Sequence, residues 1–180
     1  MLTRRLFLLM PLAVAACSAG PAATTSSRSE IGALAQAIAA LSPAVDEGEA
    51  ERAAEIAITY PMELRQRYGV TDPPLIHNTK VNMGLRPRGL CWHWADDLEA
   101  RLAQEDFATL DLQRAIANAD KLRIDHSTVI VSARGAPMEQ GIVLDGWRNG
   151  GDLFWARVPD DRRYVWERRA DVMARRQGAI

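Results

Sequence analysis

The sequence contains little cysteine and little histidine. Its 180 residues include 2 cysteines, Cys17 and Cys91, and 3 histidines. Two cysteines, of which Cys17 lies in the N-terminal leader and Cys91 has no other partner in the chain, give no disulfide framework of the kind that stabilises many small exported domains. The sequence also has no internal repeat and no nucleotide-binding or cofactor-binding fingerprint, so we expect no cofactor.

The chain also lacks an excess of charge of one sign. It has 22 basic and 23 acidic residues, which gives a net charge of −1. Proteins that bind nucleic acid typically carry a strongly basic surface, so nucleic acid is not an expected partner. The apolar run at residues 6–16 is too short to span a bilayer permanently.

The N-terminal residues have the pattern of an export signal. Arg4 and Arg5 precede the apolar run 6–16, and small residues lie directly before Cys17. We therefore expect residues 1–16 to be a signal peptide that is removed and takes no part in the fold.

The residues that end this pattern resemble a bacterial lipobox: Val14, Ala15, Ala16 and Cys17. In a lipoprotein the cysteine becomes the first residue and is acylated, for example with palmitate. Acyl chains anchor a protein through their buried methylene groups, so we expect Cys17 to hold the protein on a membrane. Ordinary secretion with cleavage at the same alanines is the alternative, and it leaves Cys17 a plain thiol.

These patterns predict a lipoprotein of the bacterial cell envelope that faces the periplasm. Ser18 after the acylated cysteine favours the outer membrane over the inner membrane. Residues 3–9 also resemble a twin-arginine signal, which would imply export after folding; the general secretory route is the alternative. Loss of residues 1–16 removes two arginines and no acidic residue, so the net charge changes from −1 to −3.

The segment after the expected cleavage point has the composition of a linker. Residues 18–29 are almost all small or polar, which is typical of a flexible tether. We therefore divide the chain into a signal peptide, 1–16, a lipidated cysteine with its tether, 17–29, and a single domain, 30–180. A domain of this length can bury a substantial hydrophobic core.

Amphipathic patterns predict two helices at the start of this domain. The first begins at Ser29 or Glu30, covers residues 31–41 and is rich in alanine. The second is capped by Asp46, covers residues 47–60 and continues beyond a kink at Pro61 to Gly69.

Residues 89–102 form the clearest helix pattern, whereas residues 75–88 show little periodicity and predict a loop. Four apolar residues recur at helical spacing and are expected to face the core: Trp94, Ala95, Leu98 and Leu102. Gly89 allows the chain to turn tightly into the helix. Cys91 then lies in the first turn, where free backbone N–H groups and the helix dipole stabilise an anion such as a thiolate.

Strand patterns follow this helix. Alternating and β-branched residues predict strands over residues 107–116, 129–133, 142–144 and 153–158, with a helix over 165–176. The second and third strands form a hairpin that has His126 and Asp145 at its opposite chain ends. Those ends lie side by side in an antiparallel pair, so both residues are expected at one edge of the sheet.

Cys91, His126 and Asp145 have the residue types of a nucleophilic triad. His126 would take the thiol proton and later supply one to the leaving group, while Asp145 would fix the tautomer of the ring. The oxyanion would be bound by the Cys91 N–H and by one donor of the preceding loop. Three residues are candidates for that donor: His77, Asn78 and Asn82. A buried, inert cysteine is the alternative interpretation of Cys91.

A zinc site is the rival chemistry for these residues. Four residues have zinc-binding side chains: His77, Cys91, His93 and His126. Cys91 and His93 are two residues apart, however, and a helix directs such residues to different faces. We therefore expect no metal, and we expect His93 to be a surface residue or a support for the site.

The same residues resemble a known family. Gly89-x-Cys91 opens a helix, His126-x-x-Val129-x-Val131 follows on a strand, and residues 143–147 read Val-Leu-Asp-Gly-Trp. Over residues 75–158 this is similar to the transglutaminase-like branch of the papain-like cysteine enzymes. The resemblance implies an α+β fold in which N-terminal helices precede a cysteine helix packed on an antiparallel sheet. It places the triad on Cys91, His126 and Asp145.

Family members are proteases, amide hydrolases, transglutaminases or inactive scaffolds. The chain departs from the family at residues 127 and 128, where Ser and Thr follow the histidine and an aromatic residue is usual. We therefore expect a thiol site that acts on an amide or peptide bond of a peptide or protein, as a hydrolase or an acyl transferase. The alternative is a catalytically silent adaptor lipoprotein that binds a partner in the same groove.

Overall fold

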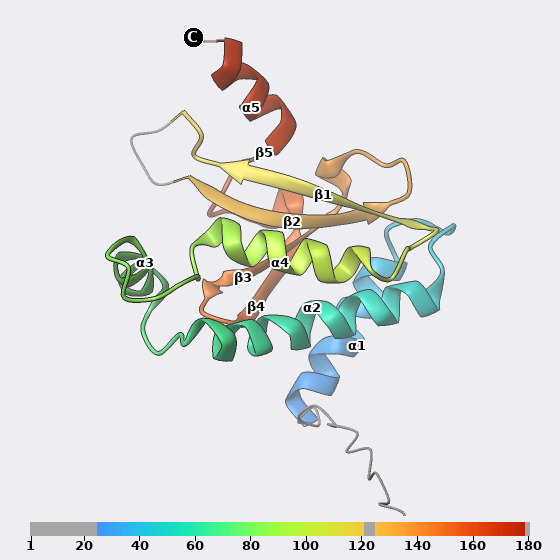
Figure 1. Ribbon diagram of the computed structural model, residues 1–180. Helices are drawn as coiled ribbons and strands as arrows, with labels where there is room; N and C mark the ends of the chain where they lie inside the picture. Colours follow the sequence, from blue (N-terminus) through green and yellow to red (C-terminus); the bar gives the residue numbers. More distant parts are fainter. Residues whose placement is uncertain (1–24, 121–124, 179–180) are drawn as a thin grey trace, which may run out of the picture.

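The computed structural model describes residues 25–120 and 125–178. These residues form five α-helices and one five-stranded antiparallel sheet (Figure 1), which is an α+β fold as expected. The predicted signal peptide and the predicted acylation at Cys17 lie outside the described residues.

Helix α1, Thr25–Ala39, begins earlier than its apolar pattern indicates. Residues 25–29, which were expected in the tether, are therefore helical; residues 17–24 lie outside the described residues. Serine and threonine add nothing to an apolar repeat, so the periodicity revealed only the packed part of the helix. Leu34 and Ile38 in that part are fully buried.

Helix α2, Glu47–Tyr68, is one element that contains Pro61. Its N-terminus is capped as expected, because the Asp46 carboxylate accepts a hydrogen bond from the Glu49 N–H at 2.9 Å. It ends at Gly69, whose φ of 64° is the left-handed conformation that glycine adopts easily.

Helix α3, Pro74–Asn82, lies where the sequence predicted a loop. This helix buries polar residues, His77 and Asn78, and exposes apolar ones, Leu75 and Ile76. A search for an apolar stripe does not detect such a helix, because its pattern is inverted. Pro74 begins the helix, a position where the missing N–H of proline costs nothing.

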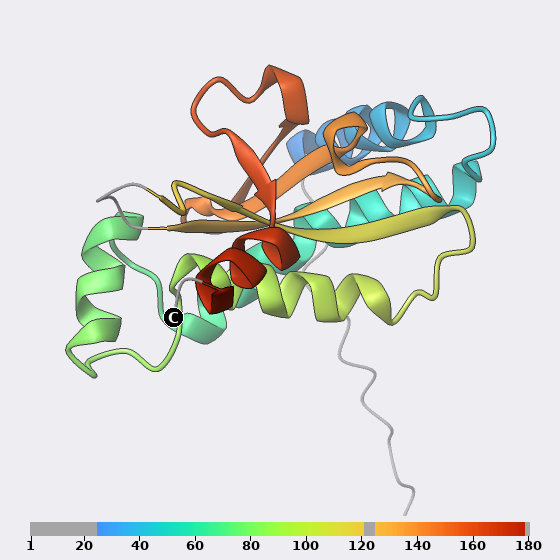
Figure 2. The same cartoon turned by 90° about the horizontal axis from the view of Figure 1, so that it is seen from above.

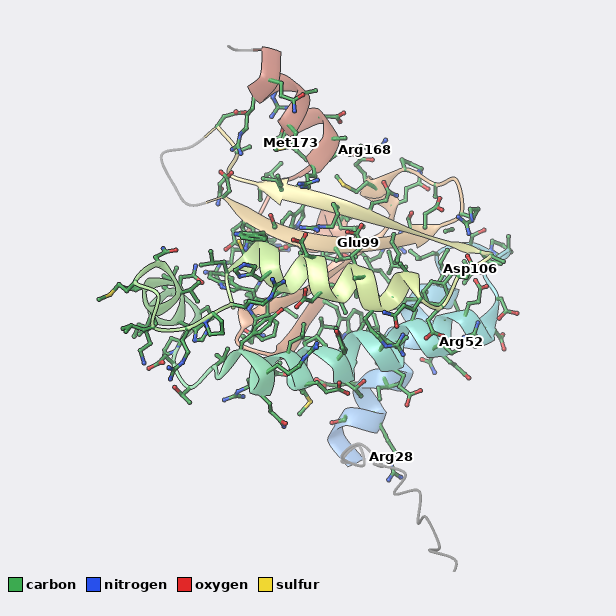
Figure 3. The ribbon with its side chains drawn as sticks, viewed as in Figure 1. Arg28, Arg52, Glu99, Asp106, Arg168 and Met173 are labelled. Carbon is green, nitrogen blue, oxygen red and sulfur yellow. The ribbon has the colours of Figure 1, made fainter. Side chains whose placement is uncertain are left out.

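Helix α4, Cys91–Ala103, lies at the centre of the molecule, between the sheet and α2 (Figure 1). The apolar residues expected to face the core are buried there: Trp94, Ala95, Leu98 and Leu102. Ala95, Leu98 and Leu102 pack with apolar residues of α1, α2 and the sheet in the main core, and Trp94 packs in a neighbouring cluster with Tyr68 and Trp147. The outer faces carry charged side chains, Arg52 of α2 and Glu99 of α4 among them (Figure 3).

The sheet has the strand order β4-β3-β2-β1-β5. Its strands are β1, Leu110–Ala117, β2, His126–Ala133, β3, Ile142–Asn149, β4, Asp152–Arg157, and β5, Trp166–Arg168. The expected hairpin is formed by β2 and β3, in the register that pairs Val129 with Leu144. The short turns η1, Met138–Gln140, and η2, Val158–Asp160, follow β2 and β4.

The strand predictions differ from the structure in extent: β2 begins at His126 rather than at residue 129, and β3 continues to Asn149 rather than ending at residue 144. β1 begins at Leu110 rather than at residue 107. β5 was not predicted, because three residues are too few to show an alternating pattern. Helix α5, Arg169–Gly178, follows β5 directly and corresponds to the later part of the helix expected over residues 165–176.

The two faces of the sheet have different neighbours. Successive side chains of a strand point to opposite faces, so Val129 and Val131 of β2 face α4, and His126 lies on the other face with Ile130. Ile130 packs with Met138, Val143 and Trp166 in a second core. The segment between β4 and β5 rises on this face, away from α4 (Figure 2).

The packing of α4 gives a test of the fold. Leu98 is 1% exposed, so Leu98→Ala removes buried methyl groups and leaves a cavity. We expect the free energy of unfolding, measured by urea denaturation, to fall by about 2–5 kcal/mol. Ala100→Ser, at an exposed position of the same helix, is expected to change it by less than about 0.5 kcal/mol. Equal changes in the two variants would contradict this packing.

Candidate functional site

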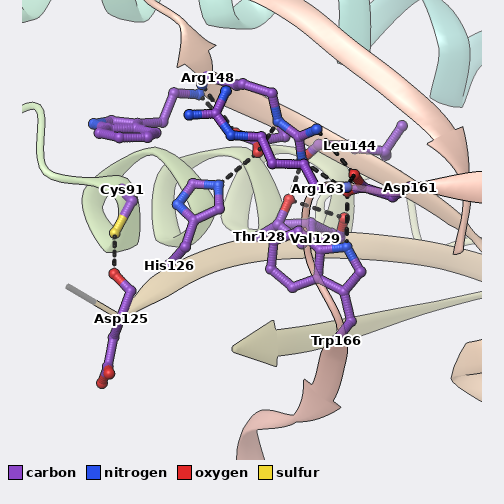
Figure 4. A network of polar contacts seen from close by, with 12 residues as sticks. Cys91, Asp125, His126, Thr128, Val129, Leu144, Arg148, Asp161, Arg163 and Trp166 are labelled. Atoms are coloured by element: carbon purple, nitrogen blue, oxygen red, sulfur yellow. Dashed lines mark hydrogen bonds and ion pairs between the residues drawn. The ribbon is translucent and has the colours of Figure 1, made fainter. Parts of the chain in front are cut away.

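Cys91 is the first residue of α4 and is a free thiol, 6% exposed. Its Sγ donates a hydrogen bond to the backbone carbonyl of Asp125 at 3.5 Å (Figure 4). The N–H of Cys91, as the first residue of the helix, has no acceptor inside the helix. This end of α4 is therefore suited to an anionic group.

Side-chain hydrogen bonds fix the loop before Cys91. The Nδ1 atom of His93 accepts hydrogen bonds from the N–H groups of Gly89 and Leu90, both at 3.1 Å. The Trp94 indole donates to the carbonyl of Gly89 at 2.9 Å. The loop conformation is thus set by side chains of the helix that it leads into.

His93 is buried, which excludes the surface position that was one expectation for it. Because its Nδ1 accepts two N–H donors, that nitrogen carries no proton and the ring is neutral. Burial and the nearby Arg88 guanidinium lower the pKa of His93 and favour this neutral form. His93 is therefore a support for the loop that carries the thiol.

His126 lies at the start of β2 and is 2% exposed. Its Nε2 is 2.6 Å from Oδ2 of Asp145, so the ring donates to the carboxylate. Nδ1 is buried and has no hydrogen-bond partner among the described residues. Figure 4 shows the His126 ring beside Cys91, with a nitrogen turned toward the thiol.

The electrostatics of His126 reflect both neighbours. Burial alone lowers the pKa of the ring, but the hydrogen bond with Asp145 and the nearness of the Asp145 carboxylate and the Cys91 sulfur outweigh burial and raise the pKa to about 9. A protonated ring beside the Asp145 carboxylate is thus favoured at this position. This is the arrangement that stabilises a thiolate–imidazolium pair.

Asp145 is held by four donors. Its Oδ1 accepts the backbone N–H groups of Trp147 and Arg148, each at 3.1 Å. Its Oδ2 accepts His126 and the Arg148 Nε, the latter at 3.1 Å. The carboxylate is 1% exposed, and these bonds satisfy its charge in place of water.

The network extends beyond the predicted triad to residues that sequence reasoning missed. Arg148 also donates two hydrogen bonds to Asp161, at 3.1 and 2.7 Å. The Trp166 indole donates to Asp161 at 3.0 Å. Neither arginine nor aspartate at these positions belongs to a recognisable motif, so the sequence carried no signal for the pair.

Aromatic rings surround His126. The centroid of its ring lies 4.9 Å from that of Trp147, 4.6 Å from that of Tyr164 and 5.5 Å from that of Trp166. These rings exclude water from the imidazole, which strengthens its electrostatic interactions with Asp145.

The three expected oxyanion donors do not share one position. His77 is buried, and its Nε2 donates to the carbonyl of Arg88 at 2.9 Å. The Asn78 Oδ1 accepts the Trp147 indole N–H at 3.0 Å. Asn82 ends α3 and is exposed. Within the part of the chain that the structure describes, none of the three is hydrogen-bonded to Cys91.

The described residues contain no group of three or more His, Cys, Asp or Glu side chains that could hold a metal ion. Cys91 and His93, the nearest pair in sequence, have separate roles: one faces His126 and the other binds the loop backbone. The zinc alternative has no ligand set in this part of the chain.

Comparisons with known proteins add nothing to this geometry. No family model matches the chain, and no curated protein or solved structure is significantly similar to it. None of the described helices is both long enough and apolar enough to cross a membrane.

Gly89 gives the first test of the site. Its φ is 128°, and a Cβ atom there would overlap the His77 ring. We expect Gly89→Ala to displace the loop, to slow alkylation of Cys91 and to lower stability. Gly84→Ala is the matched control, since Gly84 has a φ of 73° but open space around it; it should cost only about 1 kcal/mol in urea denaturation. Similar losses in the two variants would contradict a tight fit of Gly89 against His77.

The raised pKa of His126 gives a second test, through pH. The folded pKa of about 9 lies above the ordinary value of 6.5, so the folded protein binds this proton more tightly than the unfolded chain does. The stabilisation is complete below pH 6.5 and is lost as the pH rises through about 9. We therefore expect wild type to lose more unfolding free energy over this range than His126→Gln, by urea denaturation at each pH. Parallel pH profiles would contradict the raised pKa.

Proposed function

We propose that the protein is a thiol enzyme that acts on an amide or peptide bond, as a hydrolase or an acyl transferase. One observation carries the proposal: His126 binds Asp145 through Nε2 at 2.6 Å and turns its unpaired Nδ1 toward Cys91. A nucleophile, a base and a group that orients the base are thus in contact in the required order.

In the proposed reaction His126 takes the proton of the Cys91 thiol, and the thiolate attacks the acyl carbon. The Cys91 N–H at the start of α4 binds the resulting oxyanion. The C–N bond then breaks, and the amine leaves with the proton from His126. Water or a second amine attacks the thioester, gives a proton to His126 and releases the product, which restores the thiol.

The fold supports a papain-like, transglutaminase-like arrangement. The cysteine helix packs on an antiparallel sheet and is preceded by helices in the chain. The histidine and the aspartate come from adjacent strands, β2 and β3. These features agree with the α+β class that the motifs around Cys91, His126 and Asp145 implied, and they support its papain-like form as a proposal.

The N-terminal patterns support a place for this activity in the cell envelope. The lipobox-like residues 14–17 favour a lipoprotein anchored through Cys17 and facing the periplasm. Peptides and proteins of the envelope are then the substrates within reach.

A second candidate function is the capture of a partner without turnover. Five large apolar side chains near the start of α4 are exposed: Leu75, Ile76, Met83, Leu85 and Trp92. Exposed apolar surface of this kind favours binding of an apolar segment of another protein. The adaptor hypothesis requires these residues and does not require a reactive thiol.

Thiol reactivity tests the proposal. In the full chain carrying Cys17→Ser, Cys91 is the only thiol, and its alkylation by iodoacetamide can be followed by mass spectrometry against pH. We expect labelling already at about pH 6, because an imidazolium at His126 stabilises the thiolate. In His126→Ala, labelling should begin only above about pH 8.5.

Two controls make this measurement specific. Ser127→Ala alters the next residue of β2, whose side chain points to the other face of the sheet, and should leave the pH profile unchanged. Cys91→Ala should abolish labelling. Slow labelling that ignores His126 would reject the enzyme and favour the adaptor hypothesis.

A further inference from the structure

Arg148 is a buried cation that joins two buried carboxylates. Its side chain is 5% exposed, and those of Asp145 and Asp161 are each 1% exposed. Nε donates to Asp145, and the two terminal nitrogens donate to the two oxygens of Asp161 (Figure 4). The guanidinium also lies 3.7 Å from the ring centroid of Phe154.

Stability alone is a weak reason for such an arrangement. Taking a charge out of water is costly, and a buried ion pair is often no more stable than apolar residues of similar volume. A buried cluster is better explained by a requirement for one geometry. Here the atom whose position must be fixed is Oδ2 of Asp145, which accepts hydrogen bonds from both His126 and Arg148.

The charges alternate along the network, from an imidazolium at His126 through Asp145 and Arg148 to Asp161. Arg148 beside Asp145 weakens the attraction between that carboxylate and an imidazolium at His126. Asp161 offsets the charge of Arg148 through its bidentate pair. With Asp161 present, Arg148 can hold Asp145 in place without cancelling its negative charge.

We propose that Arg148 and Asp161 are positioning residues of the thiol site: Arg148 fixes the Asp145 carboxylate toward His126, and Asp161 neutralises Arg148 so that Asp145 still stabilises the imidazolium. The catalytic meaning of this role rests on the proposed function. Neither residue touches Cys91, and both act through Asp145.

Other ionisable groups around His126 are few among the described residues. Asp145 faces it from β3 with Arg148 bound to that carboxylate, Cys91 faces it from α4, and Tyr164 faces it from the segment between β4 and β5; the carboxylate of Asp125, the residue before His126, is paired with Arg176 of α5. Around Asp161 lie Arg148 and the backbone N–H of Arg163. Burial raises the pKa of Tyr164, so its phenol stays neutral while His126 titrates.

The test uses Asp161→Asn, which keeps the shape and the acceptor oxygen for the Trp166 indole but removes the charge. The His126 ring is followed by nitrogen-15 NMR against pH in the full chain with Cys17→Ser. We expect the titration midpoint of His126 to fall by about one pH unit and Cys91 alkylation at pH 6 to slow about tenfold. Asp160→Asn, which removes an exposed charge one residue earlier, should change neither.

A double variant separates an electrostatic role from a merely structural one. Arg148→Gln combined with Asp161→Asn removes the cation together with its counter-charge. The His126 midpoint should return most of the way to the wild-type value, because no uncompensated charge remains beside Asp145. If the two residues only support the fold, the double variant should be worse than either single variant.

One measurement uses wild type alone and so does not depend on the folding of a variant. In wild type the Arg148 Nε–H resonance should shift with the same midpoint as the His126 ring, since both groups bind Oδ2 of Asp145. An Arg148 signal that stays constant through the His126 titration would overturn the proposal.

The outcomes distinguish this proposal from the proposed function. A wild-type thiol labelled at pH 6, with the same His126 midpoint in Asp161→Asn, overturns the positioning role and leaves the enzyme standing. A wild-type thiol that is inert at pH 6, with a midpoint that falls in Asp161→Asn, supports the coupling and rejects the enzyme.

Discussion

The contact between His126 and Asp145, 2.6 Å in length, depends on the register of the hairpin. β2 and β3 pair Val129 with Leu144, so that His126 and Asp145 share one face near one edge. A shift of one residue in either strand would send one of these side chains to the opposite face. The register is fixed in turn by apolar residues of both strands on both faces, which fill two cores. The polar site is therefore a product of apolar packing.

Cys91 reaches this contact through a different element. α4 packs its apolar stripe on the face of the sheet opposite to His126, and its first residue lies beside the start of β2, where the thiol donates to the carbonyl of Asp125. The position of the thiol thus depends on the residue at which α4 begins and on the conformation of the loop before it. His93 and Trp94 bind the backbone of the loop at Gly89, so the helix itself defines where its N-terminus starts.

Periodicity in the sequence was sufficient for the α+β class, the cysteine helix, the hairpin and the juxtaposition of His126 with Asp145. Periodicity failed to predict the parts of the structure in which the buried residues are polar. α3 buries His77 and Asn78 and exposes its apolar side, and Arg148 meets Asp161 only because the segment after β4 crosses the sheet. Contacts between polar residues distant in sequence leave no periodic trace, since one residue on each side is sufficient to make them.

Charge pairing also explains why the site extends to the C-terminal helix. Asp125, whose carbonyl accepts the thiol hydrogen bond, pairs through its carboxylate with Arg176 of α5 at 2.7 Å. Arg176 also binds the carbonyl of Ala119 at 2.9 Å, so α5 is tied to both ends of the connection between β1 and β2. Both side chains of this pair are exposed, and exposed ion pairs contribute little to stability. The two sides of His126 are therefore held differently: the Asp145 side by a buried network, and the backbone beside Cys91 by one exposed ion pair that salt can screen.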